Sequence, residues 1–192
     1  MDFGPFQYGN GTLPRYLGFQ LSGRETFICA FKTPASLAGD EVCEWVGQVT
    51  LLGPPVDAPL RHRLPESAQQ PPVVPDQEEE KWQMLNLFIL PMHRGKGIAK
   101  SLCSEVFRWL REHKRAYGRP RPEQIRVRVM VKPENIATVK LYEGLGFMHT
   151  GKCTLAEALK ANGDGKLVPA DGGGPKYRER SGLIMATTFE RH

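Results

Sequence analysis

Cysteine is scarce in this chain, and the cysteines that occur form no pattern. Cys29, Cys43, Cys103 and Cys153 are scattered over 192 residues, with no C-x-x-C pair and no histidine at metal-ligand spacing. Neither a disulfide framework nor a metal site is therefore expected. We interpret the four thiols as reduced and mostly buried, as in an intracellular protein.

Long apolar runs are also missing. No stretch approaches the roughly 20 residues that a membrane-spanning helix requires, and the opening segment MDFGPFQYGNG has neither a basic nor an apolar signal region. We therefore expect a soluble, cytoplasmic protein without a membrane partner, and a nuclear location is left open. The net charge of +5 suits an anionic ligand, whereas nucleic-acid binding requires basic residues gathered on one face.

Length and periodicity predict one α/β domain over residues 1–192. Alternating apolar and β-branched residues predict strands, and four-residue apolar spacing predicts helices. Strands are expected over residues 24–32, 44–53, 81–91, 123–131, 147–153 and 182–191, and helices from Gly97 to about Tyr117, over 136–146 and within 154–165. The first two and the last two strands are each expected to pair antiparallel. The order of elements indicates a mixed sheet.

Three segments lack these patterns. Residues 1–23 show no clear period and form an atypical N-terminal part. Residues 54–80 are rich in proline and polar side chains, which predicts a long surface loop, either a solvated connector or a lid over a ligand. Residues 169–181 are interpreted as a flexible turn.

The segment HRGKGIAKSL, residues 93–102, follows a buried strand that ends near Pro91. The first turn of a helix exposes N–H groups that can bind an anion, and glycines let a ligand approach the backbone. Glycines at this place also serve simple chain reversal. The spacing fits neither a Walker-type P-loop nor a Rossmann fingerprint.

A second motif lies downstream, and the two motifs together resemble one known family. ILPMHRGKGIAKSL resembles the acetyl-CoA signature of the GNAT superfamily of N-acyltransferases, through Arg94, Gly97, Ala99 and the preceding Pro91. NIATVKLYEGLGF, residues 135–147, resembles a later element of the same family. The resemblance covers roughly residues 24–192. It implies a mixed, mostly antiparallel sheet with splayed central parallel strands and flanking helices.

The resemblance also implies an acetyl-CoA site. The pantetheine arm would lie against the backbone before the turn, where an N–H at Ile89 would polarise the thioester carbonyl, and the turn would wrap the pyrophosphate. The residues expected to bind acetyl-CoA are Phe88, Ile89, Leu90, Arg94, Gly95, Lys96, Gly97, Ile98, Ala99, Asn135 and Tyr142.

Tyr142 is the expected general acid, since a phenol can protonate the departing CoA sulfur; the alternative is a ring that only packs in the core. No general base is evident. The positions where relatives place a carboxylate correspond here to Gln83 and Met130, so Glu80 or a chain of water molecules is left as the acceptor of the amine proton. His93 and His149 are interpreted as surface residues.

The resulting prediction is an acetyl-CoA-dependent N-acetyltransferase whose amine attacks the thioester directly in a ternary complex. A non-catalytic acyl-CoA-binding module is the alternative, because residues 1–23 do not resemble the helices that usually build the acceptor site. The acceptor amine is not predicted, and a homodimer is left open. A basic cluster is interpreted as a solvated face rather than a nucleic-acid site: Lys100, Arg108, Arg111, Lys114, Arg115, Arg119 and Arg121.

Overall fold

The structure is a computed structural model that describes residues 24–34, 43–55, 63–112, 122–161 and 163–191. The predictions for residues 1–23 and for the end of the long helix near Tyr117 lie outside these ranges. Among the described residues, none of the helices is both long and apolar enough to cross a membrane.

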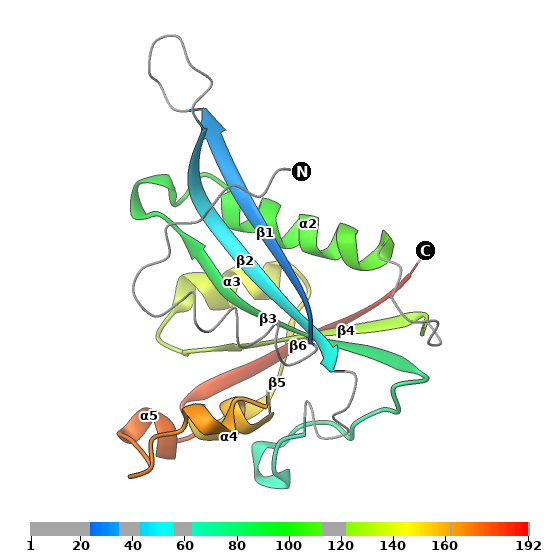
Figure 1. Ribbon diagram of the computed structural model, residues 1–192, viewed down its shortest axis with the longest axis vertical. Coiled ribbons are helices and arrows are strands. Elements are labelled where there is room, and N and C mark those ends of the chain that lie inside the picture. Colours follow the sequence, from blue (N-terminus) through cyan, green and yellow to red (C-terminus); the bar gives the residue numbers. More distant parts are fainter. Residues whose placement is uncertain (1–23, 35–42, 56–62, 113–121, 162, 192) are drawn as a thin grey trace.

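The fold is built on a sheet with the strand order β1-β2-β3-β4-β6-β5 (Figure 1). Among these described strands, β3 and β4 pair in parallel and all other neighbours are antiparallel. The predicted pairing of the first two strands and of the last two is confirmed. The strands are β1 Arg24–Pro34, β2 Cys43–Pro55, β3 Glu79–Ile89, β4 Gln124–Val131, β5 Met148–Cys153 and β6 Gly182–Glu190.

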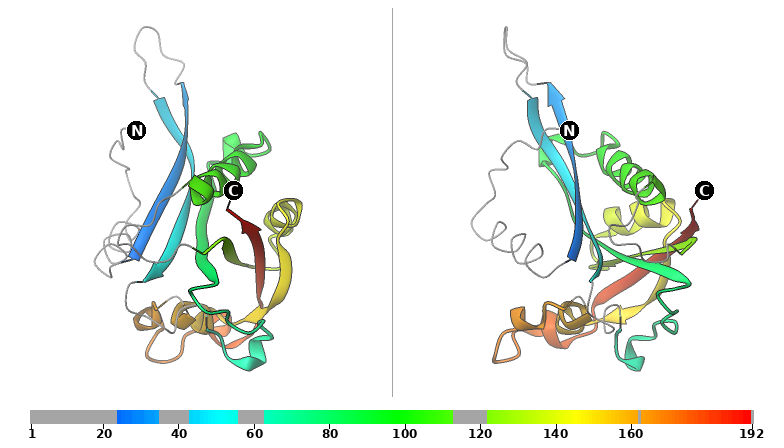
Figure 2. Two further views of the ribbon diagram at one scale, coloured as in Figure 1. Left: turned by 90° about the vertical axis from the view of Figure 1, so that its right-hand side faces the viewer. Right: turned by 45° about the vertical axis from the view of Figure 1, so that its right-hand side comes forward.

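The main core lies between the sheet and two helices, α2 (Ile98–Glu112) and α3 (Ile136–Gly144). The predicted apolar stripe of α2 is buried, and Trp82 of β3 meets Trp109 of α2 edge to face, with ring centroids 5.6 Å apart. Figure 2 shows α2 and α3 on one side of the sheet and α4 (Leu155–Ala161) near its lower end. A smaller core under α4 contains Cys153 and Ile184. The expected mixed α/β architecture is confirmed.

Two segments that were predicted to be irregular contain ordered turns. Within residues 63–78, Glu66–Ala68 form a 3-10 turn, and Ala68 is fully buried against β5. The carbonyl of Ala68 lies so close to Gly151 that a Cβ there would stand 2.0 Å away. Ala68 therefore anchors this turn on β5, while most of the described residues 63–78 are exposed, as expected for a surface loop. Within residues 169–181, which were interpreted as a flexible turn, the short helix α5 covers Pro175–Arg178.

Candidate active site

The central parallel strands separate at the site. Pairing between β3 and β4 runs from Glu79 to Gln83 and ends there at Arg128 of β4. Beyond this point both strands continue but diverge, as Figure 1 shows. A register shift between β2 and β3 falls in the same stretch, where Asn86 adopts a left-handed conformation with φ 54°. This bulge, which sequence reasoning missed, bends β3 away from β4.

The register of β3 turns one backbone donor toward this gap. The N–H of Leu90 donates to the carbonyl of Val46 at 2.8 Å. Hydrogen-bonded and non-bonded pairs alternate along an antiparallel ladder, so the adjacent pair of Gly47 and Ile89 is non-bonded. The N–H of Ile89 therefore points away from β2, and its carbonyl accepts a hydrogen bond from Arg94 Nε at 3.1 Å.

A pocket of about 480 Å³ lies between the end of β3, the glycine turn and α3. This glycine-turn pocket has a volume within the usual range for ligand sites. The structure brings most of the predicted cofactor residues to its walls. They are Phe88, Ile89, Arg94, Gly95, Gly97, Ile98, Ala99 and Asn135, joined by His93 and Lys100.

The turn itself suits an anion. Gly95 and Gly97 have φ values of 73° and 79°, and a Cβ at either position would have no other atom within 4 Å. The backbone thus favours glycine here, and the space beside it is open. α2 begins at Ile98, and the N–H of Ser101 is bonded to the carbonyl of Gly97. The N–H groups ahead of Ser101 have no partner within α2 and give this end of the helix a partial positive charge.

Three predicted cofactor residues do not line this pocket: Leu90, Lys96 and Tyr142, which lines the second pocket described below. Leu90 uses both backbone polar groups inside the protein, since its carbonyl accepts the N–H of His93 at 2.9 Å. Lys96 is exposed and lies outside the pocket wall. The strand ends at Ile89, and the 3-10 turn Pro91–His93 then redirects the chain. This turn takes Leu90 out of the extended stretch that faces the gap.

A second pocket, of about 350 Å³, opens on the other side of the gap beneath α4. This α4 pocket shares Leu87, Asn135 and Thr138 with the glycine-turn pocket, so the two meet where β3 and β4 separate. Tyr142 lines the α4 pocket and is only 4% exposed. Burial raises the pKa of the Tyr142 phenol above its ordinary value, so the hydroxyl stays protonated at neutral pH.

The positions considered for a general base have other partners. Gln83 and Met130 line the α4 pocket, and the Gln83 amide oxygen accepts a hydrogen bond from the buried Arg128 at 2.8 Å. Glu80 lies outside the described pocket walls and is buried beside Trp82, whose Nε1 donates to Glu80 Oε1 at 2.7 Å. None of the described residues of the α4 pocket carries a carboxylate or an imidazole.

Histidine and arginine side chains behave largely as the sequence predicts. His149 is exposed and pairs with Glu143 at 2.9 Å. His93 is half-buried and lines the glycine-turn pocket. Arg108 forms ion pairs within α2, and Arg111 lies over the Phe189 ring. Residues 114, 115, 119 and 121 lie outside the described ranges.

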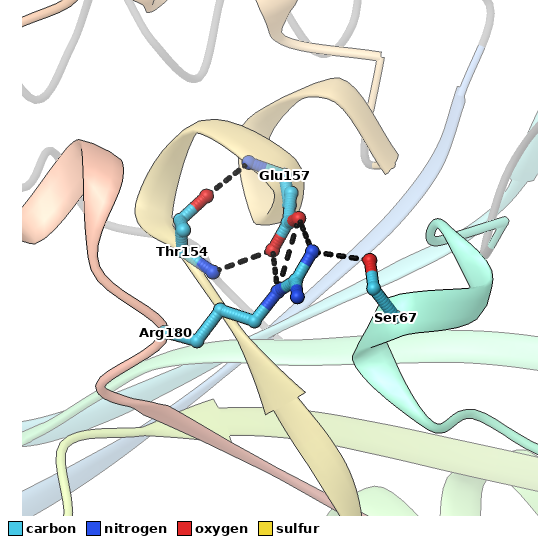
Figure 3. A network of polar contacts seen from close by, with 4 residues as sticks. All are labelled: Ser67, Thr154, Glu157 and Arg180. Atoms are coloured by element: carbon cyan, nitrogen blue, oxygen red, sulfur yellow. Dashed lines mark hydrogen bonds and ion pairs between the residues drawn. The ribbon is translucent and has the colours of Figure 1, made fainter.

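A polar network holds α4 over its pocket (Figure 3). The Thr154 hydroxyl accepts the N–H of Glu157 at 3.0 Å, and Glu157 Oε2 accepts the N–H of Thr154 at 2.8 Å. Arg180 lies 2.6 Å from Glu157 Oε1 and also donates to Ser67, which ties α4 to the loop before β3. The hydrogen bond from Arg180 lowers the pKa of Glu157. The T-x-x-E pattern of a capping box was a readable signal for this helix start.

Loss of the Thr154 cap is expected to loosen α4. Thr154→Ala removes the hydroxyl that satisfies the Glu157 N–H, and we expect it to lower the free energy of unfolding by about 1 kcal/mol. Urea denaturation measures this change. Thr154→Ser keeps the hydroxyl and serves as the matched control, which should stay near the wild type. Equal stability of the alanine and serine variants would contradict the capping role.

Comparisons with known proteins agree with this geometry. Residues 72–149, which include β3, the glycine turn, α2, β4 and α3, match the acetyltransferase (GNAT) domain family. The structure of Arabidopsis thaliana NAA60 in complex with acetyl-CoA is similar, with a TM-score of 0.55 at 16% identity over 96% of this chain and 86% of that chain. For NAA60 in complex with a bisubstrate analogue, the TM-score is 0.50 at 16% identity over 85% of this chain and 77% of that chain.

Curated protein sequences give no match. At 16% identity the similarity to NAA60 shows the fold alone, while the family match rests on the sequence of residues 72–149, which include β3, α2, β4 and α3. The splayed strands and the glycine turn at the start of α2 both lie within residues 72–149, the segment that matches the acetyltransferase (GNAT) domain family, so the chain carries a GNAT acetyltransferase domain there.

Proposed function

We propose that this chain transfers the acetyl group of acetyl-CoA to a primary amine by direct attack in a ternary complex. The observation that carries the proposal is the meeting of two pockets in the gap between β3 and β4, where both are lined by Leu87, Asn135 and Thr138. In this arrangement acetyl-CoA occupies the glycine-turn pocket, the amine enters the α4 pocket, and the thioester lies where the two join.

The backbone supplies most of the cofactor contacts in this proposal. The pyrophosphate lies at the first turn of α2, against the N–H groups after Gly97, with Arg94 beside it. The pantetheine arm follows β3 into the gap that β4 leaves open. The N–H of Ile89 donates to the thioester carbonyl, and one such donor at a developing oxyanion is worth about 3 kcal/mol of barrier lowering.

The chemical step uses one protonated side chain. The amine nitrogen attacks the thioester carbonyl carbon, the carbon–sulfur bond breaks, and the Tyr142 hydroxyl gives its proton to the departing sulfur. The burial that keeps Tyr142 protonated supports this role. The amine loses a proton to water, because Glu80 is buried away from both pockets.

An assay of CoA release with a panel of amines tests the proposal. The panel contains aliphatic monoamines, polyamines, aminoglycosides, peptides with a free N-terminus and peptides with an internal lysine. We expect saturable, amine-dependent release of CoA with at least one class. Tight acetyl-CoA binding by calorimetry without turnover on any amine would instead favour the non-catalytic binding module. Failure to bind CoA, together with salt-dependent binding to DNA or RNA, would favour a nucleic-acid role.

A further inference from the structure

A basic hollow lies on the face of the sheet opposite α2 and α3. Its walls include Lys81 of β3 and both Arg126 and Arg128 of β4, and its volume is about 260 Å³. Lys81 and Arg126 are partners in the parallel ladder, and Arg128 lies two residues further along β4. Because side chains alternate along a strand, all three leave the same face of the sheet.

The hollow concentrates positive charge. None of the described residues that line it is acidic. Two carboxylates stand outside its walls: Asp76 lies 2.7 Å from Lys81 Nζ, and Glu79 lies 2.9 Å from Arg126 Nε. Three cationic side chains thus converge near two carboxylates, and the hollow keeps a positive potential toward a ligand.

Two of these cations are deeply buried. Lys81 and Arg128 are only 4% and 3% exposed, and removing a charged group from water is costly unless an opposite charge compensates. Burial, together with the nearby charge of Arg126, lowers the pKa of Arg128 to about 10. Asp76 already compensates part of the charge of Lys81, and an anion in the hollow would add to this compensation at both side chains.

Neutral hydrogen-bonding groups complete the walls. Thr150 of β5 and Gln70 of the loop before β3 line the hollow, and the Gln70 amide donates a hydrogen bond of 3.1 Å to the Thr150 hydroxyl. Thr188 of β6 is exposed at the rim. Guanidinium groups offer paired donors that match the oxygens of carboxylates and phosphates, and hydroxyl and amide groups can add further hydrogen bonds.

We propose that the basic hollow binds a small oxyanion, through a phosphate or a carboxylate group, at a site separate from the glycine-turn pocket. The two share no lining residue among those described. The volume limits the ligand to a compact molecule. One hydrogen bond links this site to the α4 pocket, since Arg128 of the hollow donates to Gln83, which lines that pocket. The proposed binding does not depend on the acetyl-transfer reaction.

Calorimetric titration of the full chain with inorganic phosphate and, separately, with citrate tests the proposal. CoA is present at saturation, so that the glycine turn is occupied. We expect saturable binding of at least one anion, and Arg126→Gln should weaken it by about tenfold or more, because a charge-assisted hydrogen bond is lost. Binding of phosphate alone or of citrate alone assigns the oxyanion to that chemical class.

Two further variants keep the test decisive. Ala186→Leu adds bulk at the wall of the hollow without changing a charge, so it should abolish anion binding by filling the space. This variant provides the test if Arg126→Gln does not fold. Arg108→Gln removes an arginine on α2 that pairs with Glu105 and Glu112 instead, and it should leave anion affinity unchanged. The proposal is overturned if neither anion binds, or if binding survives both Arg126→Gln and Ala186→Leu. Because the readout is heat of anion binding, this result stands apart from the outcome of the amine assay.

Discussion

Tyr142→Phe is expected to lower kcat by about 100-fold to 10,000-fold, the usual contribution of a positioned general acid. The ring lies in the core against Phe147, with centroids 5.2 Å apart, and a phenylalanine ring keeps this packing. The hydroxyl is therefore removed with little change in shape. Steady-state CoA release with the best amine of the panel measures the loss, while acetyl-CoA affinity should stay nearly unchanged.

The pH profile separates the catalytic role from a packing role. Because burial raises the pKa of Tyr142 above its ordinary value near 10, the wild-type rate should not fall between pH 8 and about pH 10 from loss of this acid. Tyr177→Phe, on the short helix α5, is the matched control and should keep full activity. A Tyr142→Phe variant with the wild-type rate would remove Tyr142 from the acid role and leave it as a core residue.

Gly97→Asp is expected to weaken acetyl-CoA binding by about 100-fold. A carboxylate about 4 Å from a phosphate costs on the order of 4 kcal/mol at an effective dielectric constant near 20, and solvent screening at this exposed turn reduces the penalty. The same carboxylate lies at the N-terminus of α2, where negative charge stabilises a helix. The fold should therefore persist while the cofactor is repelled, and calorimetric titration with acetyl-CoA measures the loss.

Gly97→Asn is the matched control for this charge effect. Asparagine and aspartate have the same shape, and both tolerate the left-handed backbone that Gly97 adopts with φ 79°. The asparagine variant reports the cost of a side chain in the pocket, and the difference between the two variants reports the charge alone. Equal affinities for acetyl-CoA in both variants would contradict a phosphate position at this turn.

Local sequence patterns were sufficient for most of the fold. Period-two and four-residue spacings located β1 to β6, α2 and α3, because each element buries one apolar face and shows it as a repeat. Ala68 shows the limit of this reasoning. It lies among polar and proline residues with no period, and only its packing against β5 selects it for burial.

The same contrast holds at the site. Arg94, Gly97 and Asn135 could be chosen from the sequence, because a short segment with a fixed backbone shape carries each motif. Leu90 could not be judged in advance, since a 3-10 turn takes it out of the strand. The same turn places His93 on the wall of the glycine-turn pocket, which its sequence position did not indicate.

The sequence by itself determined that the chain is an α/β protein with a GNAT-type signature, because spacing, glycine positions and apolar period are local properties. Only the tertiary structure decided that β3 and β4 part after Gln83 and Arg128, that two pockets meet there, and that three cations gather on the opposite face. These features depend on register between strands that are some 45 residues apart in the chain. Register is set by the packing of whole elements, which no single stretch of sequence records.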